Sequence, residues 1–92
     1  MEELVQTVAE LLEAHFPGDN IRVEIEETIP GQKIGGSFVS SSFAGMAQID
    51  RQKAIRDMLR GSLPLADFLS VGMILTLTPQ EVSSMQGTTV AV

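Results

Sequence analysis

Residues 21–28 alternate between apolar and mostly charged side chains, and this alternation constrains the fold more than any other feature of the chain. The apolar positions are Ile21, Val23 and Ile25, and the charged positions between them are Arg22, Glu24 and Glu26. A period of two predicts a β-strand that buries one face and exposes the other. The chain is therefore expected to contain a sheet with one covered face.

One amphipathic helix is predicted before this strand in the sequence and another after it. Residues 2–16 place apolar side chains at helical spacing, and the Pro-Gly-Asp sequence at 17–19 ends that helix. The second helix is predicted from Asp50 to Leu63, with Asp50 as its N-cap. Residues 65–69 are expected to add one more helical turn.

Two further strands are predicted from shorter patterns. Residues 29–33 indicate a turn, and the glycine pair 35–36 is expected to extend this irregular stretch. A strand of modest apolar weight is predicted over residues 37–41. The apolar sequence at 71–77 is typical of a buried strand.

A capping signal follows the last strand. In the sequence from Thr78 to Glu81, the threonine is at the N-cap, Pro79 is at the first helical position and the glutamate stands three residues after the cap. Residues 1–86 are therefore predicted to form a single α+β domain, with helices on one face of a three-stranded sheet. Residues 87–92 are expected to be a flexible tail.

The composition argues against most kinds of catalysis. The chain has 92 residues with no cysteine, and His15 is its only histidine. Thiol chemistry and cysteine zinc sites therefore lack their residues, and no second histidine or Gly-x-Ser-x-Gly motif is available to activate a serine. We expect neither an enzyme nor a cofactor. No apolar segment reaches the ~18 residues needed to span a bilayer. Together with the acidic start of the chain, this predicts a cytoplasmic protein without a membrane association.

Charge is concentrated in one short segment. The net charge is −6, yet residues 51–60 carry +3 and the rest of the chain −9. At about 100° per residue, Lys53, Arg56 and Arg60 fall within about 60° of one another on the predicted helix. They lie opposite its apolar stripe, whereas Arg51 lies towards the apolar edge.

This basic helix has two interpretations. It is either a solvated face, partly neutralised by a pair between Lys53 and Asp57, or a docking surface for an acidic partner or for phosphates. Single-stranded nucleic acid is the less favoured ligand, because the chain has no Trp or Tyr to stack on bases. Duplex DNA remains an alternative, with weak and salt-sensitive binding because of the negative net charge.

The segment from Val39 to Lys53 resembles the signature of the BolA-like family, with Phe43 and Gly45 as its most characteristic residues. The Thr-Leu-Thr-Pro-Gln-Glu sequence at 76–81, which includes Thr78 and Pro79, resembles the end of the last strand in that family. The resemblance implies a type II KH-like fold of the order αββα(α)βα with a mixed three-stranded sheet. It also implies a non-enzymatic regulator or adaptor, in a family associated with stress response. Many members pair with monothiol glutaredoxins through a shared iron–sulfur cluster, and some are DNA-binding transcriptional regulators.

The chain departs from the family pattern where the cluster would bind. The family's Arg-His-Arg is replaced by the Arg-Gln-Lys sequence at 51–53, and the position of its cluster-ligating histidine is held by Ser70. The loop at 29–33, where a second ligand is expected, contains neither cysteine nor histidine. A hydroxyl is a poor ligand for cluster iron. We therefore expect no metal ligation by this chain.

These observations predict an adaptor that acts through protein contact, with a monothiol glutaredoxin as one partner. The predicted contact residues are Arg51, Gln52, Lys53, Arg56 and Arg60. The alternatives are a DNA-binding transcriptional regulator that uses the same helix, and a divergent paralogue with another partner.

Overall fold

The structure is a computed structural model that describes the backbone of residues 1–90 and the side chains of residues 1–85. Its elements confirm the predicted order of helices and strands. They are α1 (Glu2–His15), β1 (Arg22–Ile29), β2 (Lys33–Val39), the 3-10 turn η1 (Ser41–Phe43), α2 (Gln48–Ser62), α3 (Leu65–Leu69), β3 (Val71–Leu77) and α4 (Pro79–Val90). None of the helices over this range is long and apolar enough to cross a membrane.

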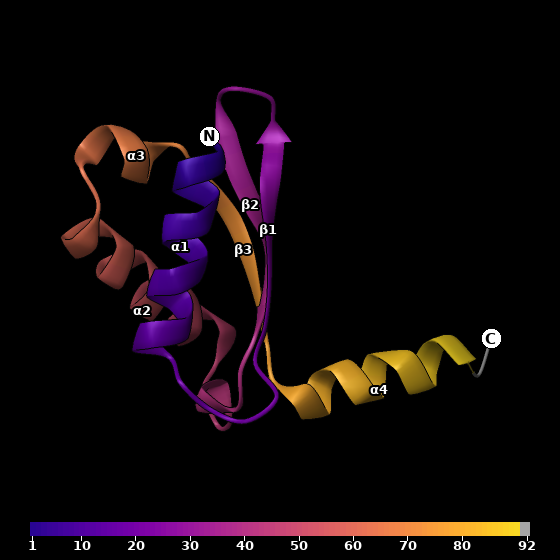
Figure 1. Cartoon of the computed structure of the whole chain (residues 1–92). Coiled ribbons are helices and arrows are strands. Elements are labelled where there is room, and N and C mark those ends of the chain that lie inside the picture. Colours follow the sequence, from indigo (N-terminus) through magenta and orange to yellow (C-terminus); the bar gives the residue numbers. More distant parts are fainter. Residues whose placement is uncertain (91–92) are drawn as a thin grey trace.

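The sheet has the strand order β1-β2-β3, and its strands are mixed in direction. Strand β1 is antiparallel to β2, whereas β3 runs parallel to β2 after the crossover through α2 and α3. Helices α1, α2 and α3 lie on one side of the sheet, and α4 projects away on the other side from the end of β3 (Figure 1). The predicted α+β sandwich with one covered face is therefore confirmed.

The core lies between the sheet and these three helices. Three phenylalanines pack together in this core. The ring centres of Phe38 and Phe43 lie 5.5 Å apart with the two rings perpendicular, and the ring centres of Phe38 and Phe16 lie 6.1 Å apart. Edge-to-face pairs of this kind add to the stabilisation that burial gives. The fully or nearly fully buried members of the core are Val8, Leu12, Ile34, Phe38, Phe43, Ile55, Leu59 and Ile74.

Strand β2 differs from the strand predicted over residues 37–41. It begins at Lys33, includes the glycine pair and ends at Val39. The two glycines belong to the strand because its neighbours approach its backbone closely: a Cβ at Gly36 would overlap the carbonyl oxygen of Glu24, and one at Gly35 would lie 2.6 Å from that of Met73. Glycine here allows close strand packing and does not mark a loop.

Strand β3 also differs from its prediction, because it is an edge strand that is only half-buried. Ile74 and Thr76 point into the core, but the side chains that alternate with them do not: Met73 is 73% exposed and Leu75 is 44% exposed. An apolar sequence reveals the strand but not whether a second layer covers it. This sheet has a helical layer on one face only.

The boundaries of α2 and α4 refine the predicted ones. Helix α2 begins at Gln48 with Ala47 as its N-cap, and Asp50 lies in its first turn, where a negative charge favours the helix dipole. The capping box of α4 is confirmed: the Glu81 N–H donates to Thr78 Oγ1 at 3.1 Å, and the Thr78 N–H donates to the Glu81 carboxylate at 2.8 Å. Helix α4 continues to Val90, beyond the start of the predicted tail at residue 87. Residues 91–92 lie outside the described residues, so a domain boundary at 86 stays a prediction.

The close approach at β2 gives a direct test of the fold. We expect Gly36→Ala to lower the free energy of unfolding by roughly 3 kcal/mol, because strands β1 and β2 must separate to admit the methyl group. The matched control is Gly61→Ala in α2, where a Cβ meets open space. That replacement should be neutral or stabilising by up to ~1 kcal/mol. Urea unfolding of both variants measures the difference, and similar effects at the two sites would contradict this account.

Candidate functional site

The exposed face of helix α2 carries the basic stripe, which we define as Lys53, Arg56 and Arg60. All three side chains are exposed, as predicted from their helical spacing. Ile49, on the same face one turn earlier, is 78% exposed and extends the stripe with an apolar end. The stripe therefore combines positive charge with an apolar contact on one helix surface.

No ion pair among the described residues neutralises the basic stripe. In the described part of the chain, ion pairs form only between the Met1 α-amino group and Glu27, and between Arg51 and Glu81. The predicted pair between Lys53 and Asp57 is not formed there. The stripe therefore keeps its positive charge at the exposed surface, where the Arg60 guanidinium carbon also lies 6.0 Å from the centre of the Phe68 ring.

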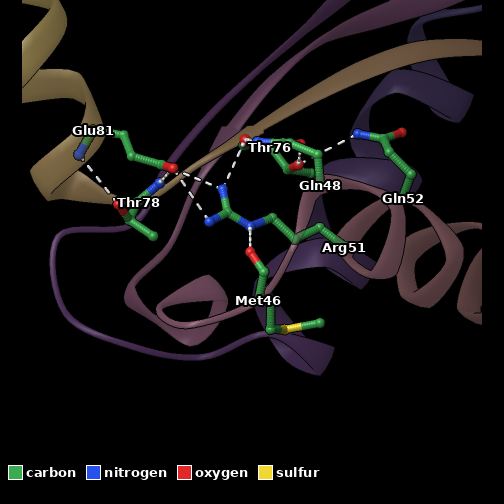
Figure 2. Close-up of polar contacts among 7 residues, drawn as sticks. All are labelled: Met46, Gln48, Arg51, Gln52, Thr76, Thr78 and Glu81. Atoms are coloured by element: carbon green, nitrogen blue, oxygen red, sulfur yellow. Dashed lines mark hydrogen bonds and ion pairs between the residues drawn. The ribbon is translucent and has the colours of Figure 1, made fainter.

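Arg51, in contrast, is part of the interior. Its side chain is 5% exposed, and its Nη1 donates to the Glu81 carboxylate at 2.7 Å. Its other contacts are hydrogen bonds from Nε to the Met46 carbonyl at 2.9 Å and from Nη1 to the Thr76 carbonyl at 3.3 Å (Figure 2). The guanidinium carbon also lies 5.8 Å from the centre of the Phe43 ring. Arg51 joins α2 to β3 and α4 and is not available to a partner.

Two glutamines of α2 cover the free edge of strand β3. Gln52 donates to the Ile74 carbonyl at 2.8 Å. Gln48 donates to the Thr76 carbonyl at 2.8 Å (Figure 2). The Thr76 hydroxyl donates back to the Gln48 amide oxygen at 2.7 Å. Unpaired carbonyls on an edge strand invite pairing with another chain, and these side chains satisfy them. The predicted contact residues therefore separate: Lys53, Arg56 and Arg60 face solvent, whereas Arg51 and Gln52 are bonded to the sheet edge.

The contact with Arg51 changes the pKa of Glu81. The hydrogen bond from Arg51, followed by that from the Thr78 backbone N–H, lowers the pKa of Glu81 from 4.5 to about 2. Glu81 is therefore ionised at neutral and mildly acidic pH. Sequence reasoning identified Glu81 only as a capping residue. The signal that could have found the ion pair is the position of Arg51 towards the apolar edge of its helix, since a buried charge needs an opposite charge.

The two positions where the family resemblance implies cluster ligands lie side by side. The Ile34 N–H donates to the Ser70 carbonyl at 2.9 Å, which brings the end of the β1–β2 loop against the start of β3. The Ser70 hydroxyl donates to the Ala66 carbonyl at 3.2 Å, and the Lys33 ammonium donates to the Leu69 carbonyl at 2.5 Å. Cluster iron takes thiolate or imidazole, so a hydroxyl and an ammonium do not fit it. Among the described residues, no three His, Cys, Asp or Glu side chains are grouped so that they could hold a metal ion.

Comparison with solved structures identifies the fold. BolA1 from Arabidopsis thaliana is similar over 88% of this chain and 98% of its own, with a TM-score of 0.68 and 22% identity. The BolA domain of SufE1 from Arabidopsis thaliana is similar over 84% of this chain and 93% of its own, with a TM-score of 0.65 and 21% identity. A bol-like protein from Babesia bovis is similar over 89% of this chain and 92% of its own, with a TM-score of 0.63 and 19% identity. The sequence matches no protein-family model and no curated protein. The chain therefore has the BolA-like fold, and the resemblance seen in residues 39–53 and 76–81 is confirmed at the level of the fold.

The different environments of Arg51 and Lys53 predict different effects on stability. We expect Arg51→Met to lower the free energy of unfolding by about 2–3 kcal/mol, because it leaves the Met46 and Thr76 carbonyls without a charged donor. Lys53→Met removes the same charge from the exposed face and should change stability by less than about 0.5 kcal/mol. Chemical denaturation of both variants measures this difference. Equal effects would mean that the Arg51 network contributes nothing to stability.

The lowered pKa of Glu81 predicts a pH dependence of stability. Because the folded state holds the carboxylate ionised, the stabilisation is complete above about pH 4.5 and is lost as the pH falls towards about 2. Thermal unfolding of wild type and Glu81→Gln should therefore differ most above pH 4.5 and converge near pH 2. In the Arg51→Met background the same replacement should have a smaller effect. An undiminished effect in that background would show that Arg51 is not the main cause.

Proposed function

We propose that the protein is a BolA-family adaptor or regulator that acts without catalysis, by docking a partner protein on the basic stripe of α2. A monothiol glutaredoxin is the proposed partner. The observation that carries this proposal is the exposed, unneutralised stripe of Lys53, Arg56 and Arg60 in a chain whose net charge is −6. The BolA-like fold supports the family and thereby the class of function.

The exposed Ile49 favours a protein partner over phosphates. Protein interfaces combine an apolar centre with a charged rim, and Ile49 offers the apolar contact at one end of the stripe. Phosphate binding would use the three cations alone and would work against the negative charge of the rest of the chain. Binding of duplex DNA through this exposed helix is the second candidate, because the same cations are free to meet a backbone.

We propose that docking does not include cluster ligation by this chain. Ser70 and Lys33 occupy the places where ligands are expected, and both side chains are hydrogen-bonded to the backbone of α3. A cluster carried by the partner would then keep its own ligands when the two proteins meet. Its visible absorption should be unchanged by binding.

The stripe is tested by reversal of its charge. Titration of a monothiol glutaredoxin into the triple variant Lys53→Glu, Arg56→Glu, Arg60→Glu should show binding weakened at least tenfold, because attraction becomes repulsion at three points. The matched single variants are Arg56→Glu on the stripe and Arg22→Glu on β1, which reverse one exposed arginine each. Only the first should weaken binding. Equal effects of the two would indicate a general dependence on net charge and not a docking site.

The same titrations separate the two candidate functions. Duplex DNA that binds the wild type more tightly than glutaredoxin does, and loses affinity steeply with salt, would favour the DNA-binding regulator. A shift in the absorption of a cluster-loaded glutaredoxin on binding would contradict the proposal that this chain ligates no cluster. Undiminished glutaredoxin binding by the triple variant would place the docking surface elsewhere.

A further inference from the structure

The face of the sheet that α1, α2 and α3 leave uncovered has a regular pattern set by strand register. Glu24 pairs with Ser37, which in turn pairs with Leu75, so these three residues form one row across the sheet. In the next row Glu26 pairs with Gly35, and a Cβ on Gly35 would lie against the Met73 carbonyl. These two rows pass from an acid on β1, through a small residue on β2, to an apolar side chain on β3. The row nearest α4 differs, because Arg22 pairs with Val39 and Val39 with Leu77.

This pattern makes three columns on what we call the open face. The acidic column is Glu24 and Glu26, and the apolar column is Met73 and Leu75, two large side chains that are 73% and 44% exposed. The middle column of Gly35 and Ser37 has little side-chain volume. A hollow of about 340 Å³ lies between the two acids and Ser37, with Gly36 also in its lining. Met73 and Leu75 are two large exposed apolar side chains on one strand face, and such a pair offers an apolar contact to a partner.

The dimensions of this face fit a helix. Adjacent strands lie about 4.8 Å apart, so the outer columns are separated by roughly 10 Å, which is about the diameter of an α-helix. Helix α4 projects on this side of the sheet and limits the open face at one end (Figure 1). A second hollow of about 290 Å³ lies at that corner, lined by Val39 of β2 and by Val82 of α4 among others.

We infer that the open face docks an amphipathic helix of a partner protein, with apolar residues against Met73 and Leu75 and lysines or arginines against Glu24 and Glu26. The acidic column selects a basic helix by charge complementarity, and the glycine and serine of β2 make room for it. A second copy of the chain is a poorer occupant, because a symmetric contact of two open faces would bring the acids of both copies into one interface. The protein would thus have two docking surfaces on opposite sides of its sheet.

The inference can be tested with a defined probe. The probe is a labelled synthetic helix of about five turns, with leucines along one stripe and lysines beside them. Fluorescence anisotropy should show that it binds the wild type and that the double variant Met73→Thr, Leu75→Thr weakens binding about tenfold or more. Threonine retains the strand propensity of β3. The matched control is Leu65→Thr, Leu69→Thr, which removes two exposed apolar side chains from α3 and should have no effect.

A second pair of variants tests the acidic column. Glu24→Gln, Glu26→Gln should weaken binding severalfold at low salt and remove much of its salt dependence, because two charge contacts are lost. Glu2→Gln, Glu3→Gln removes the same charge from α1 and should leave binding nearly unchanged. Equal effects of the two pairs would overturn the inference, since the peptide would then be responding to net charge. So would comparable binding of a leucine–glutamate helix.

Mapping on the unmodified protein keeps the test independent of how the variants fold. Chemical-shift changes caused by the peptide should concentrate at Ser37, Met73 and Leu75 and should spare Lys53 and Arg56 on the far side. Shifts centred on α2 or α1 would overturn the inference. Concentration-dependent dimerisation that Met73→Thr, Leu75→Thr abolishes would identify a second copy as the occupant and would also overturn it. None of these variants alters the basic stripe, so failure here is distinguishable from failure of the proposed function.

Discussion

The ion pair between Arg51 and Glu81 is the contact on which the arrangement of α2, β3 and α4 depends. One carboxylate oxygen of Glu81 accepts from both Arg51 and the Thr78 backbone N–H, so the start of α4 is tied directly to α2. Arg51 also bonds to the carbonyl of Thr76, in the strand that leads into α4. Since α4 projects away from the domain, its direction is set at this first turn (Figure 1). The pair thereby determines where the open face of the sheet ends.

Helix α2 uses different side chains for contacts within the domain and for contacts that are open to a partner. Gln48, Arg51 and Gln52 point from α2 to the carbonyls along β3, and this blocks the edge of the sheet from pairing with another strand. The next positions around the helix, occupied by Lys53 and Arg56, are free for solvent or a partner. The β3 edge is therefore closed to strand pairing, and the recognition that we propose uses side chains on the two faces of the domain. Those faces differ in charge, which favours different partners on each.

The sequence predicted the features that depend on local chemistry. Alternation at 21–28 identified β1, and the spacing from Thr78 to Glu81 identified the start of α4, because strand period and capping act within a few residues. The glycine pair was misplaced because its need for glycine comes from Glu24 and Met73 on neighbouring strands. Exposure of Met73 depends on the absence of a second layer over the described sheet, and no local pattern reports that. Arg51 and Lys53 are close in sequence but lie on different sides of the helix, which helical geometry predicted in part.

The contacts of Ser70 show that the fold needs no particular metal-binding side chain at this position. The backbone of Ser70 holds β2 against β3 through its carbonyl, and its hydroxyl completes the end of α3, so neither contact needs an imidazole. Under our proposal a serine there preserves the fold and offers cluster iron no thiolate or imidazole. Binding strength in the proposed adaptor then comes from its surfaces. An apolar column beside an acidic one on the sheet, and a basic stripe with Ile49 on α2, provide the buried apolar area and the charge selectivity that a metal bridge would otherwise supply.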